Sequence, residues 1–369
     1  MNAAALRLCF ALVLGLAGLV AAVGPAPARV AAARDGAQRG AASEWWRLTG
    51  HVRARDGRRF ALAATFFRFA VRGTARRPWP GASAWSGGEF FPATFALVDE
   101  RERRYLSATR VERGAFGFGR AEAGGLDVAA GPWSLRAAAP APSGAPVFDV
   151  HVESGGTTVD LRQVALKPRV AFGARGIVRS GSCAGCVEHA FAYTRLHARG
   201  TVRIDGVAYA VEGTTWLDHE FGSHELAPGD AGWDRFSIQL DDGRDVLVRV
   251  VRRADGTPSP ATSGELVARN GALTNLGAAD VAVATVAKTT WRSRASGTVY
   301  PVLWQLIVPK AHLDLAVVPP FEAQEIVSMQ GGPDYYEGSV DVERAPPPGG
   351  DPGTGFVELT GYRRPLTGL

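Results

Sequence analysis

The stretch EWWRLTGHVRARDGRRFALAATFFRF, residues 44–69, decides the fold. Its two halves alternate apolar and polar residues, and the pair Asp56-Gly57 lies between them. Asp-Gly between two alternating runs is a strong signal for a β-hairpin. We therefore expect strands from Trp45 to Arg53 and from Arg59 to Phe69, joined as a hairpin.

The same hairpin signal recurs at Asp205-Gly206 and at Asp242-Gly243. Glycine makes up 45 of the 369 residues, mostly in short turns, and long helical periodicity is scarce. The chain is therefore expected to be all-β, with enough strands in each half for an antiparallel barrel around a small apolar ligand. Later strands are expected over residues 299–308, 313–318, 323–328, 335–342 and 355–362.

The length of 369 residues predicts two domains at about 150 residues each. The irregular stretch 223–232 contains Pro228-Gly229-Asp230, so we place the boundary there, with domains over residues 41–223 and 224–369. Before them, Arg7 and an apolar run from Leu8 to Val23 are followed by small residues. This order is typical of a secretory signal. We expect a signal peptide over residues 1–28 and an exported, periplasmic or extracellular protein.

The composition and the motifs that the sequence lacks exclude several classes of function. Apolar residues make up 46% of the chain and charged residues 21%, and the net charge is +5 with no basic block. A globular protein that does not bind nucleic acid is expected. The Gly-x-Ser-x-Gly elbow, the His-Glu-x-x-His zinc motif and phosphate loops are absent from the sequence. We therefore expect no metal, no nucleotide and no other cofactor.

Two cysteines follow the predicted signal, Cys183 and Cys186. In an exported chain such a pair favours a small-loop disulfide, because a zinc site needs two further ligands at suitable spacing. Free thiols and redox chemistry are the alternatives that the residues leave open.

The densest cluster of ionisable side chains is Asp218-His219-Glu220, directly after a predicted strand. At a period of two, Trp216, Asp218 and Glu220 share one face and His219 lies on the other. One interpretation is a carboxyl group beside an aromatic wall, suited to acid catalysis. The other is that the charged side chains hydrogen-bond loop backbone while Trp216 fills the core.

Several short motifs together carry a family resemblance. They are EWWxLTG at residues 44–50, TFFR at 65–68, YTRL at 193–196, WxDHEFGS at 216–223, GWD at 232–234 and ELTGY at 358–362. In this order they resemble the lipocalin-like family of carotenoid 1,2-hydratase (hydroxyneurosporene synthase). They are most similar to its exported bacterial relatives, which carry the label of predicted secreted hydrolases.

The resemblance implies two packed lipocalin-like (calycin) β-barrels. It also implies that Asp218 protonates an isolated C=C of an apolar chain, with His189 and His219 orienting water or the acid. The ligand wall implied by resemblance and residue type consists of Trp45, Trp46, Phe191, Trp216, Glu220 and Trp233. Trp45 and Trp46 point to opposite faces of one strand, so at most one of them lines a cavity.

The chain departs from the hydratase pattern at three places. Trp216 stands where hydratases carry a Tyr, His219-Glu220-Phe221 replaces His-Asn-Trp, and Arg235 interrupts an aromatic pair. Hydration of a hydrophobic small molecule is therefore the leading hypothesis among three. The others are a non-enzymatic carrier of a lipid or other hydrophobic ligand, working beside a membrane-associated export system, and a secreted ester or lactone hydrolase.

Overall fold

The computed structural model describes residues 35–70, 88–179, 187–222, 226–328, 332–344 and 353–366. The chain divides into two compact units, Met1–Asp35 and Gly36–Leu369, and every element below belongs to the second. The predicted signal over residues 1–28 and the pair Cys183 and Cys186 lie outside the described residues. No helix within those described ranges has the length and apolar character that a membrane crossing requires.

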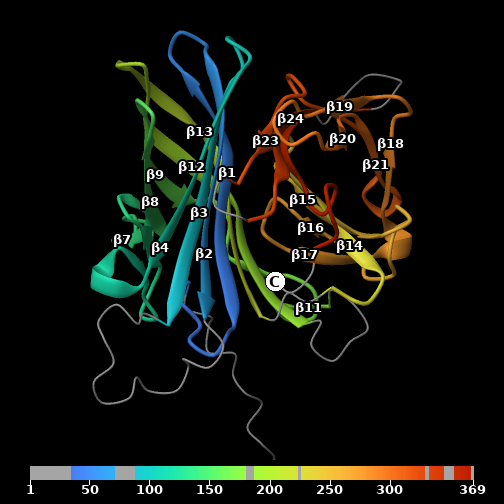
Figure 1. Cartoon of the computed structure of the whole chain (residues 1–369), viewed down its shortest axis with the longest axis horizontal. Helices are drawn as coiled ribbons and strands as arrows, with labels where there is room; N and C mark the ends of the chain where they lie inside the picture. The colour runs from blue at the N-terminus through green and yellow to red at the C-terminus, as the bar shows by residue number, and fades with distance from the viewer. Residues whose placement is uncertain are drawn as a thin grey trace, which may run out of the picture. The chain divides into compact units, whose positions relative to one another are not determined.

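The alternating runs of the first half form a thirteen-stranded antiparallel sheet (Figure 1). Its strands are β1 (Ser43–Ala54), β2 (Arg59–Ala70), β3 (Glu89–Asp99), β4 (Arg104–Arg113), β5 (Gly119–Ala121), β6 (Asp127–Ala130), β7 (Trp133–Ala138), β8 (Val147–Ser154), β9 (Thr157–Ala165), β10 (Val170–Ala171), β11 (Ile177–Arg179), β12 (Val187–Ile204) and β13 (Val207–Gly222). The main path runs β4-β3-β2-β1-β13-β12-β9-β8-β7-β6-β5. Strands β3 and β4 near one end contact β5 and β6 at the other, so the sheet is a nearly closed barrel.

A second antiparallel sheet of ten strands follows and forms a half-barrel. Its strands are β14 (Asp230–Leu240), β15 (Asp245–Arg253), β16 (Ser263–Val267), β17 (Leu273–Gly277), β18 (Ala282–Thr285), β21 (Trp304–Val308), β22 (Leu313–Val318), β23 (Glu325–Ile326), β24 (Tyr335–Arg344) and β25 (Gly353–Leu359). A separate pair is made by β19 (Thr290–Arg292) and β20 (Val299–Pro301), and three short 3₁₀ helices cover Ala115–Gly117, Ala278–Asp280 and Pro309–Ala311. The prediction of an all-β fold with two packed antiparallel barrel-like sheets is confirmed.

The three Asp-Gly pairs all form the predicted hairpins. They join β1 to β2, β12 to β13 and β14 to β15. At the second hairpin, Asp205 and Gly206 both have positive φ, 49° and 83°, as a type I′ turn requires. The predicted run over residues 299–308 splits instead into β20, which pairs with β19, and β21, which pairs with β18 and β22.

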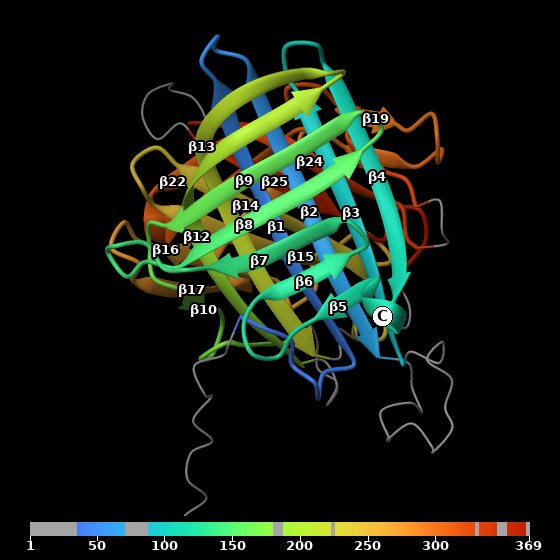
Figure 2. The same cartoon turned by 90° about the vertical axis from the view of Figure 1, so that its left-hand side faces the viewer.

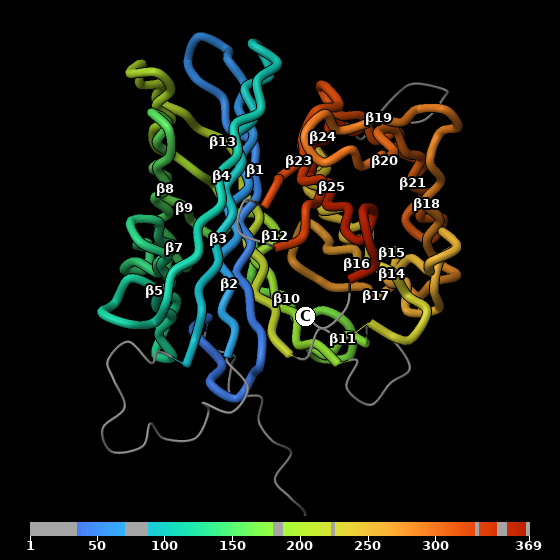
Figure 3. Tube along the Cα trace, viewed as in Figure 1, coloured from blue at the N-terminus to red at the C-terminus, as the bar shows by residue number. Residues whose placement is uncertain are grey.

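Each sheet has its own apolar interior. Trp46, Phe95 and Trp133 are among the buried side chains inside the first sheet, and Phe236 and Trp304 lie inside the second. Strands β1, β2, β3, β12 and β13 form the wall of the first sheet that faces the second (Figure 3). The opposite wall, β5 to β9, lies in front in Figure 2.

Two apolar patches lie between the outer faces of the two sheets. The first joins Ala61, Ala63, Ala96 and Val98 to Phe321, Ile326, Tyr335 and Phe356. The second joins Val170, Phe172, Val178, Ala190, Ala192 and Trp216 to Leu247 and Val267. Removing this apolar surface from water stabilises the packing of one sheet on the other.

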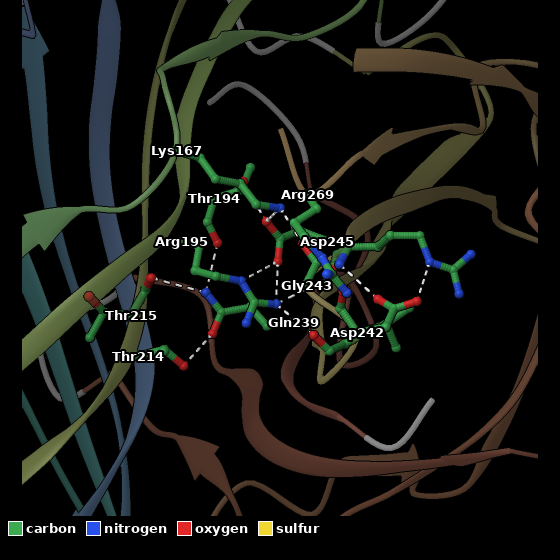
Figure 4. A network of polar contacts seen from close by, with 12 residues as sticks. Lys167, Thr194, Arg195, Thr214, Thr215, Gln239, Asp242, Gly243, Asp245 and Arg269 are labelled. Carbon is green, nitrogen blue, oxygen red and sulfur yellow. Dashed lines mark hydrogen bonds and ion pairs between the residues drawn. The ribbon is translucent and has the colours of Figure 1, made fainter. Parts of the chain in front are cut away.

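A polar clamp also ties the sheets together (Figure 4). Asp245 of β15 is fully buried and accepts hydrogen bonds from Lys167 Nζ at 2.6 Å, Thr194 Oγ1 at 2.7 Å and Arg195 Nη2 at 2.7 Å. Gln239 of β14 donates to the carbonyl oxygen of Thr194 at 2.7 Å. All three donors to Asp245 come from the first sheet or the segment after β9, so one carboxylate holds three elements in register.

We expect Asp245→Ala to lower the free energy of unfolding by about 3–5 kcal/mol, because it removes the counter-charge of the buried Lys167 and the partly buried Arg195. Asp149→Ala is the matched control, since Asp149 pairs with Arg162 at an exposed position, where such pairs contribute at most about 1 kcal/mol. Urea unfolding of both variants measures the difference. Equal losses would contradict a role for the clamp in holding the sheets.

Candidate functional site between the two sheets

Strand β13 presents its charged residues to two different environments. Trp216, Asp218 and Glu220 share the face that points toward the second sheet, as the period of two predicts. Leu217 and His219 point into the first sheet, where His219 stacks on Trp46 with ring centroids 4.9 Å apart. The candidate acid therefore lies between the sheets and not inside a barrel.

Asp218 is fully buried and is held by three side chains. Trp216 Nε1 donates to its Oδ1 at 2.7 Å. Its Oδ2 lies 2.8 Å from Arg235 Nη2 and 3.6 Å from Arg47 Nη1. Burial raises the pKa of this carboxyl, the Arg235 charge opposes the rise, and the neighbouring Glu220 adds to it.

Arg47 of β1 and Arg235 of β14 connect the carboxyl groups of three strands, β13, β24 and β25. Arg47 Nη2 donates to Glu337 Oε1 of β24 at 2.6 Å, and its Nε lies 3.3 Å from Glu358 Oε2 of β25. Arg235 Nη1 donates to Glu220 Oε1. Asp218 and Glu220 thus share one guanidinium, and Asp218 shares a second one with residues of the other sheet.

These groups belong to a larger charged cluster at the centre of the interface. Arg249 of β15 adds a pair with Glu188 of β12 at 2.6 Å, and Glu265 of β16 lies within electrostatic range of Arg249 and Arg235. The charged cluster consists of three guanidinium groups, from Arg47, Arg235 and Arg249, and six carboxyl groups, from Glu188, Asp218, Glu220, Glu265, Glu337 and Glu358.

The excess of carboxyl groups favours retention of protons. A buried carboxylate without a full counter-charge lowers its free energy by binding a proton. Burial raises the pKa of Glu337 to about 7 against the opposing charge of Arg47. It also raises the pKa of Glu265 to about 7 against Arg249 and Arg235. The cluster can therefore hold exchangeable protons near neutral pH, as a general acid requires.

A cavity of about 90 Å³ lies above this cluster. Its apolar wall includes Trp45, Phe67, Phe69, Trp233 and Leu366. Its charged floor is formed by Arg47, Glu188, Glu220, Arg235, Arg249 and Glu358. The volume has room for several water molecules or one small ligand group, and the aromatic rings can stabilise a nearby positive charge.

The structure brings five of the proposed site residues to this place. Trp45, Glu220 and Trp233 line the cavity, and Trp233 Nε1 donates to Glu358 Oε1 at 2.6 Å. Asp218 and Trp216 lie directly behind the floor, because Asp218 contacts the lining residue Arg235. Of the tryptophan pair, Trp45 is the one at the cavity and Trp46 fills the interior of the first sheet.

The remaining proposed residues lie on the inner face of the first sheet. His219 Nε2 is hydrogen-bonded to Glu44 Oε1 at 2.7 Å, and Glu44 also pairs with Arg68 at 2.9 Å. His189 and Phe191 both stack on Phe221, with centroids 4.8 and 6.1 Å away, and burial lowers the pKa of His189. Because both histidines lie on the other face from Asp218, neither enters the mechanism proposed below.

Arg47, Arg249, Glu337 and Glu358 were not identified from the sequence as site residues. They come from strands far apart along the chain, and only the packing of the two sheets brings them together. A usable signal was present at Arg47, which shares a strand face with Trp45 within an otherwise apolar stretch. Arg235 was noticed as an interruption of an aromatic pair, and it proves to be the partner of Asp218.

The comparisons agree with this architecture. A family model described as AttH-like matches residues 23–362. The chain belongs to the AttH-like family. The structure of this AttH-like chain is similar to the crystal structure of a candidate AttH protein from Nitrosomonas europaea, with a TM-score of 0.76, 26% sequence identity, and coverage of 89% of this chain and 95% of the other.

A second solved structure shares the fold. It is kievitone hydratase from Nectria haematococca, with a TM-score of 0.66, 16% identity, and coverage of 90% of the AttH-like chain and 92% of the hydratase. No curated protein sequence matches the AttH-like chain. The predicted resemblance to the lipocalin-like hydratase family and its relatives is confirmed at the level of family and fold.

Proton retention by Glu337 makes stability depend on pH in a definite direction. An unfolded Glu titrates near pH 4.3, whereas burial raises the pKa of Glu337 to about 7. Between these values the unfolded chain has lost the proton that the folded chain keeps, so this group lowers stability as pH rises. This loss of stability is complete once the pH exceeds the pKa of Glu337 in the folded chain, which is about 7.

We therefore expect Glu337→Gln, which has no proton to lose, to gain about 1–3 kcal/mol relative to wild type between about pH 5 and pH 7. Urea unfolding across this range measures the difference. Glu322→Gln at an exposed position controls for the loss of one negative charge. A difference between Glu337→Gln and wild type that stays constant over the range would contradict proton retention at Glu337.

Proposed function

We propose that this chain is an exported hydratase-like protein that adds water to a C=C bond of an apolar or amphiphilic small molecule. The observation that carries the proposal is the aromatic cavity above a buried cluster with twice as many carboxyl as guanidinium groups. The AttH-like family membership and the fold shared with a hydratase support the same class of function.

The pair of Asp218 and Glu220 is the proposed acid. Both carboxyl groups contact Arg235, and burial together with the neighbouring Glu220 favours a proton on Asp218. Glu220 lines the cavity, so a proton held by the pair can leave from it. Asp218 lies behind the floor, where burial raises the pKa of its carboxyl, so in this proposal it holds the proton and Glu220 relays it to the cavity.

The proposed reaction balances without a cofactor. The carboxylic O–H bond breaks and its proton adds to one alkene carbon, which leaves a positive charge on the other carbon. The faces of Trp45 and Phe67 stabilise that charge. A water oxygen then bonds to the cationic carbon, and its surplus proton returns to the carboxylate, so the net change is the addition of one water.

One observation favours a second candidate, a carrier of a lipid or other hydrophobic ligand working with a membrane-associated export system. Asp218 is ion-paired and does not itself line the cavity. A carboxylate with a purely structural role would show the same two features. In that case the aromatic wall holds the ligand and the charged floor only ties the two sheets together.

Comparison of Asp218→Asn with wild type distinguishes the two candidates. We expect the variant to fold and bind ligand but to lose turnover, because the amide supplies neither the proton nor the charge. Mass spectrometry of small molecules extracted from protein purified from its native envelope makes the test. The variant should carry a molecule lighter by one water than the molecule on wild type.

Asp234→Asn is the matched control. Asp234 is also a buried aspartate, but it accepts a hydrogen bond from Tyr362 at 3.0 Å, away from the cavity floor. It should carry the same molecule as wild type. An identical, unchanged lipid on wild type and on both variants would overturn the hydratase proposal and support the carrier.

A further inference from the structure

Two more hollows continue from the inter-sheet cavity into the molecule. The first, the middle hollow, measures about 10 Å³ and shares Glu220, Arg235 and Arg249 with the cavity. The second, the polar groove, measures about 580 Å³ and shares Val178, Ser263 and Glu265 with the middle hollow. The three spaces therefore lie in sequence, and most of the side chains between them are charged or carry a hydroxyl group.

The middle hollow has the size and the polar groups that a water molecule needs. A site for one water requires about 10–15 Å³ and two to four polar partners. Arg249 Nη2 is buried and makes no hydrogen bond among the described residues, whereas Arg235 Nη2 is ion-paired with Asp218 Oδ2 at 2.8 Å. The carboxyl groups of Glu220 and Glu265 line the same space. One open donor group, on Arg249, and the carboxyl groups of two lining residues thus border a volume that fits one water.

The polar groove differs from the cavity in chemistry. Arg179, Asp230, Ser259 and Asn275 line it, together with the buried hydroxyl of Thr262, which has no hydrogen-bond partner among the described residues. The cavity on the other side has an aromatic wall. An apolar molecule that fills the cavity would exclude water from that side, whereas the polar groove would remain open to it.

We propose that the middle hollow is a water-binding site that connects the polar groove to the charged floor of the cavity. Water reaches Arg235 and Glu220 from the groove, past Ser263 and Glu265, while the apolar ligand occupies the opposite side. The role of this water as the reacting water rests on the proposed function. The presence of the water site does not, and it is tested independently below. Burial raises the pKa of Glu265 to about 7, so this group can also relay a proton along the route.

The indole N–H of Trp216 reports on water in the middle hollow. Trp216 packs with Phe172, Val178, Ala190 and Leu247, all of which line the hollow. Its N–H is bonded to Asp218, whose other oxygen contacts Arg235. Hydrogen–deuterium exchange of this proton, followed by NMR, measures water access without any substrate.

The experiment uses Thr65→Phe as the background, because Thr65 lines the cavity and the larger ring fills it from the ligand side. Adding Ser263→Leu fills the middle hollow and should slow Trp216 exchange by about tenfold. Adding Ala261→Leu, which enlarges a side chain of the groove outside the hollow, should leave the exchange rate unchanged. Val178→Phe fills the hollow from its opposite wall and replaces Ser263→Leu if that variant does not fold.

A crystal structure supplies the second measurement, with an ordered water expected within hydrogen-bond distance of Arg249 Nη2. Equal exchange rates with and without Ser263→Leu, or a dry hollow, would overturn the water site. These results do not depend on turnover. Slowed exchange in a protein that leaves its ligand unchanged would support the water site while contradicting the hydratase proposal.

Discussion

The arrangement of the two sheets depends on the neutralisation of Arg47. This guanidinium is almost fully buried and lies within ion-pair distance of Asp218 on its own sheet and of Glu337 and Glu358 on the other. A buried cation is tolerated only when carboxylates approach it closely and in good geometry. The two sheets must therefore pack at the distance and register that bring β24 and β25 onto β1 and β13.

The cavity follows from the same constraint. Small side chains such as Ala61 and Ala63 allow close packing where the interface is apolar, and Trp216 fills space on the other flank. Between these patches the long side chains of Arg47 and Arg235 extend toward fixed partners and cannot also fill all of the intervening volume. The cavity consequently lies between the outer faces of the two sheets, while large aromatic rings occupy the interior of the first.

The sequence was sufficient to predict the three Asp-Gly hairpins and the all-β class, because hairpin chemistry is local. Asp56-Gly57 and Asp205-Gly206 each specify a turn from two adjacent residues, and alternation specifies which side chains share a face. It was also sufficient to place Trp216, Asp218 and Glu220 together. It was not sufficient to predict on which side of the sheet the cavity lies, because alternation separates two faces without showing what covers each one.

The partners of Asp218 could not be predicted either, because alternation along one strand does not show which distant strands pack against it. Glu337 lies more than a hundred residues from Asp218 along the chain, and the link between them is the guanidinium of Arg47 from a third strand. A charged residue in an apolar strand indicates a buried contact, but a single sequence does not indicate with which residue. Arg235 is an example. The sequence showed it as an exception to an aromatic pattern, but it did not show that its partner is Asp218.

The composition of the interface itself argues that its centre was not selected for stability alone. Buried ion pairs can often be replaced by apolar side chains of similar volume without loss of stability, and sometimes with a gain. The interface is packed with apolar side chains on both flanks, whereas its centre consists of buried ion pairs. There Arg249 Nη2 also makes no hydrogen bond among the described residues, and Arg249 lines the hollow where we place a water molecule. Departures of this kind concentrate at functional sites, so the excess carboxyl groups and the open donor together mark the position where we place the chemistry.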